Sequence, residues 1–439
     1  MVRNYIEARE FIDRITMEKG SVPGLEAVRA LLFKMGNPQN KLKAIHVAGT
    51  NGKGSVIAYI FNILKCAGYR VGTYNSPSVF EYLERIRVDG INISEQEYAE
   101  GISHIQSIYS EMKEAGESLP TAFEMETALA FDYFVRSKCD IVIIETGMGG
   151  RLDATNVCDE VLASVIMSVS MDHMEFLGDT VEKIAYEKAG IIKNGCPVIV
   201  YNQSENVMGV VRKRAEELQA QLTVSGEPQN ICYDADTTRF DYMSRVSGHA
   251  YDNLLISLKG SIQVRNACVA LEVIEVVKKM QYNIDSVHIK KGLVSTKWPG
   301  RFEKICDNPL IYIDGAHNPD AVKTLNDTVD MYYKEYTKIY IMGVFKDKDF
   351  EKELEYIVEG ASHIFTVTPD NKRALAAEEL ASVINSIRNI ASPEKTVEQA
   401  VGLAVTMAES IMDKKSVIIA FGSLSYLGEV TECVKTLTE

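Results

Sequence analysis

The sequence predicts an α/β protein with two domains, each built on a mostly parallel sheet that helices cover on both faces. Short apolar runs alternate with helical segments of about 10–15 residues, which is typical of parallel strands joined by crossover helices. Glycine-rich turns follow several of the apolar runs, and the alternation stops and restarts near residue 297. At 439 residues the chain is also too long for one ordinary hydrophobic core.

The first domain is expected to span residues 1–297. Two amphipathic helices come first, at residues 4–17 and 25–35. The strands that follow are expected at residues 44–48, 69–75, 139–145, 161–167 and 197–201, and the helices at residues 55–68, 126–138, 180–193 and 264–280. Between about residues 229 and 258 the pattern weakens into short fragments, which indicates a small β-subregion.

The second domain is expected at residues 298–439, after a boundary at Pro299 and Gly300 beside the only tryptophan. Here the alternation of apolar runs and helices restarts. Strands are expected at residues 309–315, 338–344, 363–369 and 416–423, with helices at residues 321–336 and 376–387 among them. This pattern predicts a smaller, Rossmann-like α/β domain.

The composition narrows the class of protein. Apolar residues at 46% and charged residues at 25% are ordinary for a globular chain. A formal net charge of −14 repels polyphosphate backbones, which disfavours a nucleic-acid partner. No apolar run approaches the roughly 20 residues that cross a bilayer, and the N-terminal segment lacks a signal-peptide core. The eight cysteines are scattered without a C-x-x-C pair, so we expect a cytoplasmic protein without a membrane partner, a disulfide framework or a zinc site.

The stretch HVAGTNGKGSV, residues 46–56, is similar to a phosphate-binding loop but has different spacing. In the usual pattern, G-x-x-x-x-G-K-[ST], a glycine stands where this chain has Val47, and a hydroxyl residue stands where it has Gly54. The loop still lies between a strand and a helix, where glycine N–H groups and the helix N-terminus can bind oxyanions. Lys53 can reach the β and γ phosphates, and Ser55 supplies a hydroxyl one position later. These features favour a P-loop-type ATPase domain over a glycine-rich turn with a surface lysine.

A carboxylate, Glu145, stands at the end of the apolar strand CDIVIIE and is followed by three glycines within five residues. Ligands of parallel α/β sheets collect outside the carboxyl ends of the strands. A carboxylate placed there suits Mg²⁺ that bridges phosphates. The structural alternative is an ion pair between Glu145 and Arg151. Together with the lysine of the loop, Glu145 favours the metal role.

Other polar side chains follow strands in the same way. Asp172 and His173 come just after the strand at residues 161–167, so we favour a site role for His173 over that of a hydrogen-bonded structural histidine. Lys188, judged by its helical surroundings alone, would be taken for a solvated lysine.

In the second domain, Asp314 and His317 follow a strand and precede a helix. Arg301 is a cation near the domain boundary and is suited to a nucleotide phosphate. The segments GVFKDKDF and AFGSLSYLG are further loops at strand ends, and all of these loops could line one face of the domain.

Seven motifs in this order resemble the folylpolyglutamate synthase and dihydrofolate synthase family, a branch of the ATP-dependent Mur ligase superfamily. They are GTNGKGS, ETGMGGRLDATN, DHMEFLGDT, EKAGIIK, WPGRFE, DGAHNP and FGS, and they extend over nearly the whole chain. The unusual spacing of the phosphate loop is similar to that superfamily's own version. The resemblance implies that ATP phosphorylates a carboxylate, that the amine of L-glutamate attacks the acyl phosphate, and that ADP and phosphate leave.

The resemblance also implies roles for individual residues, with ATP and Mg²⁺ as cofactors. The catalytic set would be Lys53, Glu145, His173 and Lys188, with Lys188 matching a lysine that is carbamylated in the family. ATP would be bound by Gly49, Thr50, Asn51, Gly52, Lys53, Gly54, Ser55, Asn266, Arg301 and Asp314, and the metal by Ser76, Glu145 and His173. The pteroate part of the substrate would contact Gly24, Leu25, Thr121, Ala122, Phe123, Glu124, Arg151 and Asp153, and the incoming glutamate His317 and Ser423.

Two alternatives stay open at this point. A Mur-type ligase of another acceptor would carry a separate N-terminal domain, but only about 45 residues precede the loop, fewer than the roughly 50 of a small domain. A regulatory P-loop ATPase would leave the second domain without a role. Whether the acceptor is dihydropteroate, a reduced folate or both is not decided by the sequence. We expect a monomer that binds only small-molecule substrates.

Overall fold

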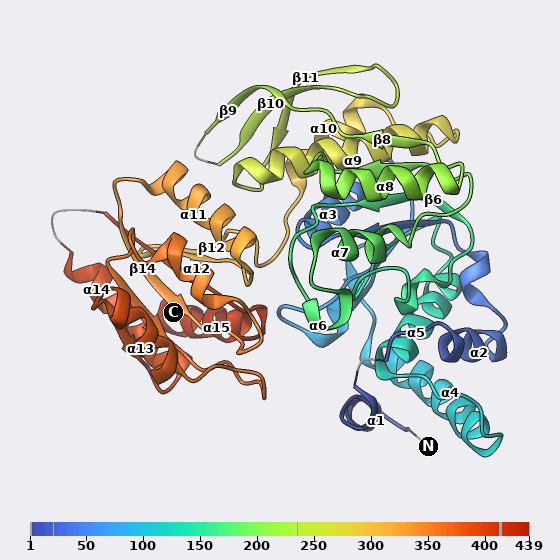
Figure 1. The fold of residues 1–439 in the computed structure, drawn as a ribbon, viewed down its shortest axis with the longest axis horizontal. Helices are drawn as coiled ribbons and strands as arrows, with labels where there is room; N and C mark the ends of the chain where they lie inside the picture. The colour runs from blue at the N-terminus through green and yellow to red at the C-terminus, as the bar shows by residue number, and fades with distance from the viewer. Residues whose placement is uncertain (1, 21, 235, 412–414, 439) are drawn as a thin grey trace. The chain divides into compact units, whose positions relative to one another are not determined.

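The computed structural model describes residues 2–20, 22–234, 236–411 and 415–438, and the chain divides into two compact units (Figure 1). The first unit comprises Met1–Tyr233, Thr238–Ser257 and Val264–Thr296. The second comprises Asp234–Thr237, Leu258–Gln263 and Lys297–Glu439. Two short segments that the sequence pattern assigns to the first domain therefore pack in the second unit.

An eight-stranded sheet forms the centre of the first unit, with the strand order β4-β3-β2-β5-β1-β6-β7-β8. Six neighbouring strands, from β2 to β8, run parallel, whereas β3 and β4 pair antiparallel at one edge. The strands are β1 (Ala44–Ala48), β2 (Val71–Tyr74), β3 (Ile86–Val88), β4 (Ile91–Asn92), β5 (Ile141–Glu145), β6 (Val161–Ile166), β7 (Val198–Val200) and β8 (Leu222–Val224). The expectation of a parallel α/β sheet is confirmed.

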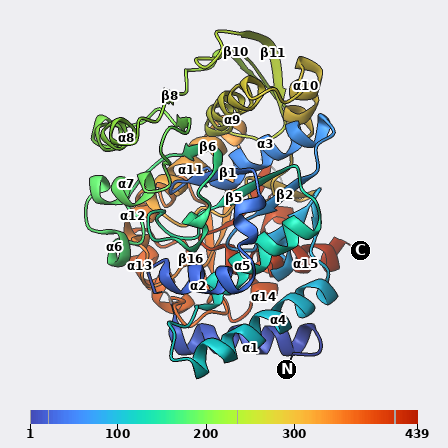
Figure 2. The same ribbon diagram turned by 90° about the vertical axis from the view of Figure 1, so that its right-hand side faces the viewer.

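Helices cover both faces of this sheet because its central strands are apolar on both sides. Alternate residues such as Val142 and Ile144 of β5 pack against the helices of one face. On that face lie α1 (Tyr5–Lys19), α2 (Glu26–Lys34), α4 (Glu95–Glu114), α5 (Ala122–Arg136), α7 (Val181–Ala189) and α8 (Glu205–Glu217). Helix α3 (Lys53–Cys66) packs beside β1, β2 and β5, and α10 (Ser286–Ser295) packs on α3, as Figures 1 and 2 show. The sequence pattern did not predict α4 or α8.

A small antiparallel sheet follows in the chain and confirms the predicted β-subregion. It consists of β9 (Gln229–Tyr233), β10 (Thr238–Met243) and β11 (Ala250–Ile256). Glu272 of α9 (Ser261–Lys279) accepts hydrogen bonds from the Tyr242 hydroxyl at 2.5 Å and the Ser244 hydroxyl at 2.7 Å. This buried carboxylate ties the small sheet to the helix.

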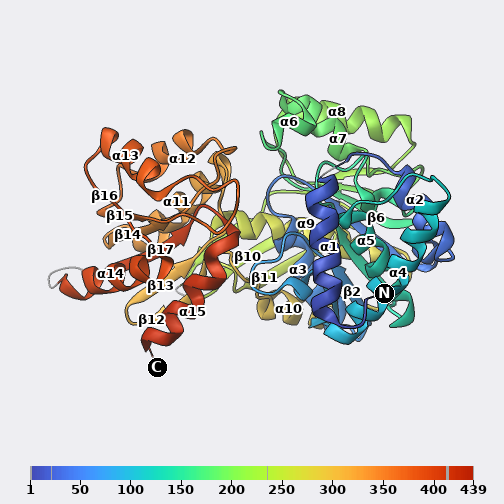
Figure 3. The same ribbon diagram turned by 90° about the horizontal axis from the view of Figure 1, so that it is seen from below.

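The second unit holds a six-stranded sheet with the order β12-β13-β17-β14-β15-β16, parallel except for β12. Its strands are β12 (Glu303–Asp307), β13 (Leu310–Ile313), β14 (Thr337–Met342), β15 (His363–Thr366), β16 (Ala391–Pro393) and β17 (Ser416–Phe421). Its helices are α11 (Pro319–Tyr333), α12 (Phe350–Ile357), α13 (Ala377–Ile387), α14 (Val397–Ser410) and α15 (Leu427–Thr438). Figure 3 shows α11, α12 and α13 on one side of this sheet, and α14 and α15 on the other.

Short helices complete the described chain: α6 (Met174–Leu177), η1 (Pro38–Lys41), η2 (Tyr82–Arg85), η3 (Ala154–Val157) and η4 (Leu424–Tyr426). Among the helices of the described ranges, none combines the length and the apolar character that a bilayer span requires.

Candidate active site

The glycine-rich loop leads from the end of β1 directly into α3. Hydrogen bonds to the segment after β6 hold its shape. The Thr50 amide donates to the Ser168 carbonyl at 2.7 Å, and the Thr50 hydroxyl is bonded to both the amide and the carbonyl of Ser170, at 3.1 and 3.2 Å. The loop therefore lies at the carboxyl ends of two neighbouring strands, β1 and β6, where ligands of parallel sheets bind.

Two positions of the loop require glycine. Gly52, the residue before α3, has φ +87°, and a Cβ there would lie 2.9 Å from Oδ1 of Asn266. At Gly49 a Cβ would lie 2.6 Å from Cβ of Met167. Of the predicted ATP contacts, Asn266 of α9 thus stands directly beside the loop. Glycine at these positions leaves no Cβ in the loop that leads to the amides at the start of α3, where a helix N-terminus can bind an anion.

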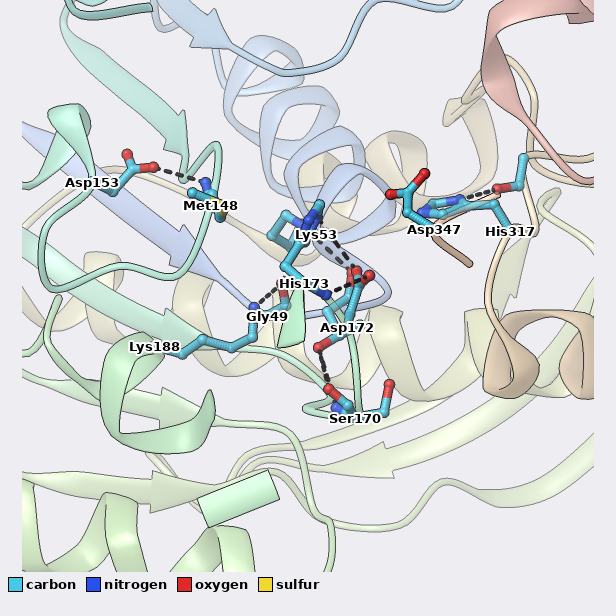
Figure 4. Close-up of polar contacts among 12 residues, drawn as sticks. Gly49, Lys53, Met148, Asp153, Ser170, Asp172, His173, Lys188, His317 and Asp347 are labelled. Carbon is cyan, nitrogen blue, oxygen red and sulfur yellow. Dashed lines mark hydrogen bonds and ion pairs between the residues drawn. The ribbon is translucent and has the colours of Figure 1, made fainter. Parts of the chain in front are cut away.

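The predicted lysine and carboxylate meet at this loop. Nζ of Lys53 lies 3.7 Å from Oε1 of Glu145. The same Nζ donates to the carbonyl of Gly49 at 3.0 Å, and Figure 4 labels these two residues. The strand register explains the meeting, because Glu145 of β5 pairs with Val47 of β1. Both charges are largely shielded from water, with side-chain exposures of 17% for Lys53 and 8% for Glu145.

A residue that the sequence analysis missed orients the carboxylate. Asn75 follows β2, the strand on the other side of β5, and its Nδ2 donates to Oε2 of Glu145 at 3.0 Å. Ser76, a predicted metal ligand, is the next residue. The only sequence signal for Asn75 is a polar residue after a strand, and its partner depends on the strand order.

The alternative pairing of Glu145 with Arg151 does not occur. Arg151 instead donates to Oε1 of Glu187 through Nε at 3.1 Å and Nη2 at 2.9 Å. The two charges proposed for phosphate chemistry, Lys53 and Glu145, are therefore paired with each other.

Lys188 is buried, with 4% of its surface exposed, and its Nζ donates to the carbonyl of Gly49 at 2.9 Å. Burial, followed by the nearby charge of Lys53, lowers the pKa of Lys188 to about 7. A solvated helix lysine, which the helical pattern alone suggests, is thus wrong for this position. The amine lies under the phosphate loop, and Figure 4 shows it reaching Gly49 from α7.

His173 and Asp172 lie in the same group of side chains (Figure 4). His173 has φ +49° and precedes α6, and its Nε2 is 3.6 Å from Oδ2 of Asp172. The described residues contain no group of three or more His, Cys, Asp or Glu side chains arranged around a common metal position. Mg²⁺ commonly takes most of its ligands from phosphate and water, so a single carboxylate such as Glu145 is compatible with the predicted metal role.

Several of the predicted pteroate contacts surround one loop. The amide of Gly24 donates to the carbonyl of Leu152 at 3.4 Å, which brings Gly24 and Leu25 beside Arg151 and Asp153. Asp153 is buried and accepts from the Met148 amide at 2.8 Å. Burial raises the pKa of Asp153, although its hydrogen bonds oppose that shift.

The segment TAFE begins α5 and has a structural role of its own. Thr121 and Glu124 form a reciprocal cap, in which the Thr121 amide and hydroxyl donate to Glu124 at 2.7 and 2.9 Å. Thr121, Ala122 and Glu124 are buried, whereas Phe123 retains exposed surface. Phe123 is therefore the residue of this segment that can present a side chain to a ligand.

The second unit also gathers predicted residues at the carboxyl ends of its strands. Asp314, after β13, accepts from the amides of Phe302 and Ala316, both at 2.8 Å, and burial raises its pKa, opposed by Arg301. His317 Nδ1 is 2.7 Å from the Gly315 carbonyl. Ser423 follows the neighbouring strand β17, and the preceding amide, that of Gly422, donates to the Ala316 carbonyl at 2.9 Å. These contacts bring the loops of Asp314, His317 and Ser423 together within this unit.

Comparisons with known proteins agree with this arrangement. The model of the Mur ligase middle domain matches residues 47–274, and that of the Mur ligase glutamate ligase domain matches residues 300–424. The chain is 33% identical over 440 residues to the dihydrofolate synthase/folylpolyglutamate synthase of Bacillus subtilis, covering 99% of this chain and 100% of the relative.

Solved structures show the same similarity. A folylpolyglutamate synthase of Mycobacterium tuberculosis, complexed with ADP and AMPPCP, superposes with a TM-score of 0.88 at 26% identity and 99% coverage of both chains. A folylpolyglutamate synthase complexed with AMPPCP and folate superposes with a TM-score of 0.80 at 27% identity, covering 98% of this chain and 100% of that one.

Proposed function

Because the chain belongs to the folylpolyglutamate synthase and dihydrofolate synthase family of Mur ligases, we propose specific roles for its site residues in glutamate ligation. The protein is an ATP-dependent carboxylate–amine ligase that joins L-glutamate to a folate-type acceptor. The observation that supports the residue roles best is the 3.7 Å separation of Lys53 and Glu145 beside the glycine-rich loop.

The chemistry needs charge neutralisation and positioning more than a protein nucleophile. A carboxylate is a poor electrophile until one of its oxygens becomes part of a phosphate leaving group. Transfer of the γ-phosphoryl group from ATP gives an acyl phosphate and ADP, and attack by the glutamate amine then forms the amide and releases phosphate. Lys53 and the amides from Gly49 to Ser55 would hold the phosphates while this charge moves.

Magnesium would be held by Ser76, Glu145 and His173, and when bound it would neutralise charge on the phosphate oxygens. Asn75 would keep the Glu145 carboxylate oriented, as its hydrogen bond of 3.0 Å supports. Lys188, whose pKa is lowered to about 7 by burial, would be available as a neutral amine. A neutral amine can add CO₂ and release a proton to give a carbamate, which supports the modification that the resemblance implies.

The remaining roles follow the same proposal. Phe123 and the loop from Arg151 to Asp153 would contact the pterin acceptor, together with Gly24 and Leu25. Asn266, Arg301 and Asp314 would contact ATP. His317 and Ser423 would bind the incoming glutamate. Residues 1–297 would form the ATP-binding domain, and residues 298–439 would form the glutamate-ligase domain.

We further propose that reduced folates are acceptors and that dihydropteroate is a second acceptor. The similarity to a Bacillus subtilis protein named for both activities supports this proposal. The test measures phosphate release from ATP with glutamate and either dihydropteroate, tetrahydrofolate or no acceptor. Release that requires glutamate and occurs with both acceptors is expected. Release with only one acceptor would contradict the double activity, and release without any acceptor would indicate a regulatory ATPase.

The partners are proposed to be small molecules alone. The net charge of −14 supports the exclusion of nucleic acid, and a cytoplasmic location without a membrane partner is part of the same proposal. A monomer is proposed, which light scattering of the purified protein at assay concentration would check.

A further inference from the structure

A buried ionic cluster joins four elements of the first unit behind Phe123. It consists of Arg9 of α1, Tyr82 and Arg85 of η2, Tyr98 of α4 and Glu126 of α5, and we call it the Arg85 cluster. Helices α1, α4 and α5 pack against one another (Figure 1). Arg85 Nη1 is 2.6 Å from Oε2 of Glu126, with side-chain exposures of 14% and 4%. Tyr98 donates to Oε1 of Glu126 at 3.1 Å, and Tyr82 also donates to that oxygen.

Each guanidinium group of the cluster has a carboxylate partner: Arg85 pairs with Glu126, and Arg9 pairs through Nη2 with Asp13 at 2.7 Å. The phenols stay neutral because burial and Glu126 raise the pKa of Tyr82 and Tyr98. The guanidinium of Arg9 lies 3.1 Å from the centroid of the Tyr82 ring. Nη1 of Arg9 and Nε of Arg85 are buried without a hydrogen-bond partner. Such an arrangement is expensive to bury and contributes geometric specificity more reliably than stability.

One side of the cluster faces the aromatic ring that stands at the proposed acceptor site. The guanidinium of Arg85 is 5.9 Å from the ring centroid of Phe123, and Tyr74 stacks on the same ring with centroids 6.0 Å apart. The Cζ end of the ring packs against the loop after Glu145, where a Cβ at Gly147 would lie 2.5 Å from Cζ of Phe123. The ring is thus held between the Arg85 cluster and the loop that continues from Glu145.

We propose that Arg85 is a positioning residue: held by Glu126 and the Tyr82 hydroxyl, it fixes Phe123 against Gly147 and so sets where the pterin acceptor lies relative to Glu145. This inference rests on the proposed function. A small displacement of the ring would move the acceptor carboxylate away from the phosphate that must reach it, and misplacement of about 1 Å can cost about a hundredfold in rate.

Tyr82→Phe tests the proposal with the smallest change. It removes one oxygen, which accepts from Arg85 Nη1 at 3.1 Å and donates to Glu126. Tyr242→Phe is the matched control, because the Tyr242 hydroxyl also donates to a buried carboxylate, Glu272, at 2.5 Å, in the small antiparallel sheet. Arg85→Lys keeps the charge but replaces the planar guanidinium, whose Nη1 donates to both partners.

The measurements are steady-state kinetics with varied acceptor or varied ATP, and calorimetric binding of folate and of AMPPCP. Tyr82→Phe and Arg85→Lys are expected to raise KM and Kd for the acceptor about tenfold, with the values for the ATP ligands unchanged. Tyr242→Phe is expected to lower thermal stability without this split. Unchanged acceptor binding in Tyr82→Phe, equal losses for acceptor and ATP, or the same split in Tyr242→Phe would overturn the proposal. If Arg85→Lys does not fold, the result for Tyr82→Phe alone decides whether Arg85 is a positioning residue. A wild-type protein that is inactive with glutamate and every acceptor would instead refute the proposed function.

Discussion

The ammonium group of Lys53 and the carboxylate of Glu145 form an ion pair of 3.7 Å at the mouth of the glycine-rich loop. Lys53 is the first residue of α3, after the loop that follows β1. Glu145 is the last residue of β5, the strand beside β1. The same ammonium donates to two loop carbonyls, those of Gly49 at 3.0 Å and Thr50 at 3.3 Å. The cation is thus held at the loop by local carbonyls as well as by the acid, which suits a group that must bind phosphate oxygens.

Separate substitutions at this pair are expected to abolish ligation for different reasons. Lys53→Met removes the phosphate cation, and Glu145→Gln removes the anion while keeping the shape and the bond from Asn75. Each should lower acceptor-dependent phosphate release by about a hundredfold or more. Lys53→Met should also cost about 1–3 kcal/mol of stability, because Glu145 then stays buried without its cation. In the double variant, urea denaturation should show that the stability lost in Lys53→Met is recovered, while ligation activity stays lost. Wild-type rates of phosphate release in either single variant would contradict the proposed roles of Lys53 and Glu145.

Glycine substitutions can separate backbone strain from the role of the phosphate loop. Gly52 and Gly68 have nearly the same positive φ, +87° and +88°, at opposite ends of α3. Alanine at either position should destabilise the fold by about 1 kcal/mol. At Gly52 the new Cβ would also meet Asn266 at 2.9 Å, whereas at Gly68 nothing lies within 4 Å. Calorimetry should therefore show weaker AMPPCP binding, by about tenfold or more, in Gly52→Ala alone; equal affinity in the two variants would argue against an ATP role for the loop.

Lys188 makes stability depend on pH in a defined direction. Burial lowers its pKa from 10.5 to about 7 in the folded protein, so the unfolded chain binds more protons between these two values. Stability contributed by this residue therefore rises with pH over that interval, and the full penalty is present below about pH 7. Lys188→Met removes the charge. Its free energy of unfolding, relative to wild type, should be larger at pH 6 than at pH 10 by roughly 2–4 kcal/mol.

Denaturation with urea at pH 6, 8 and 10 measures this difference. Lys183→Met, on the exposed face of the same helix, should show no such trend, because Lys183 pairs only with Asp179 at the surface. A difference between Lys188→Met and wild type that stays constant from pH 6 to 10 would show that Lys188 is not a buried amine with a lowered pKa.

The parts of this site that could be predicted from sequence depend on local order along the chain. A strand, a glycine turn and a helix are consecutive, so the loop with Lys53 could be predicted even with unusual spacing. Glu145 could be placed because it ends an apolar run. The link from Asn75 to Glu145 could not, because it depends on β2 and β5 being neighbours in the sheet. Strand order is a long-range property that single-strand patterns do not contain.

The burial of charged residues in helices also could not be predicted from the sequence. Lys188 lies in a helix with charged neighbours, so its pattern predicts a solvated side chain, yet its amine reaches Gly49 at 2.9 Å, 139 residues away in the sequence. Thr121 and Glu124 show the opposite case. Their T-x-x-E spacing is a local signal for a helix cap, and the structure has that cap. The helices α4 and α8 were not predicted, although their buried residues recur at helical spacing.

Glu353 of α12 supplies a prediction in the second unit. The residue is fully buried, and neither carboxylate oxygen has a hydrogen-bond partner. Burial raises its pKa from 4.5 to about 8, with Lys348 opposing the shift. The folded protein therefore binds more protons than the unfolded chain between these values, and stability falls as the pH rises through this interval. Glu353→Gln, which stays neutral, should match wild type near pH 4.5 and exceed its stability by roughly 2–4 kcal/mol at pH 8.

Urea denaturation followed at pH 4.5, 6 and 8 separates this effect from a general change in surface charge. Glu355→Gln lies on the exposed side of the same helix and is the matched control. It removes the same charge without removing a buried one, so its stability should follow wild type at every pH within about 0.5 kcal/mol. Parallel behaviour of the two variants would mean that the Glu353 carboxylate reaches water or a partner in solution. A gain confined to Glu353→Gln and growing with pH would show that a lone buried acid limits the stability of the second unit under alkaline conditions.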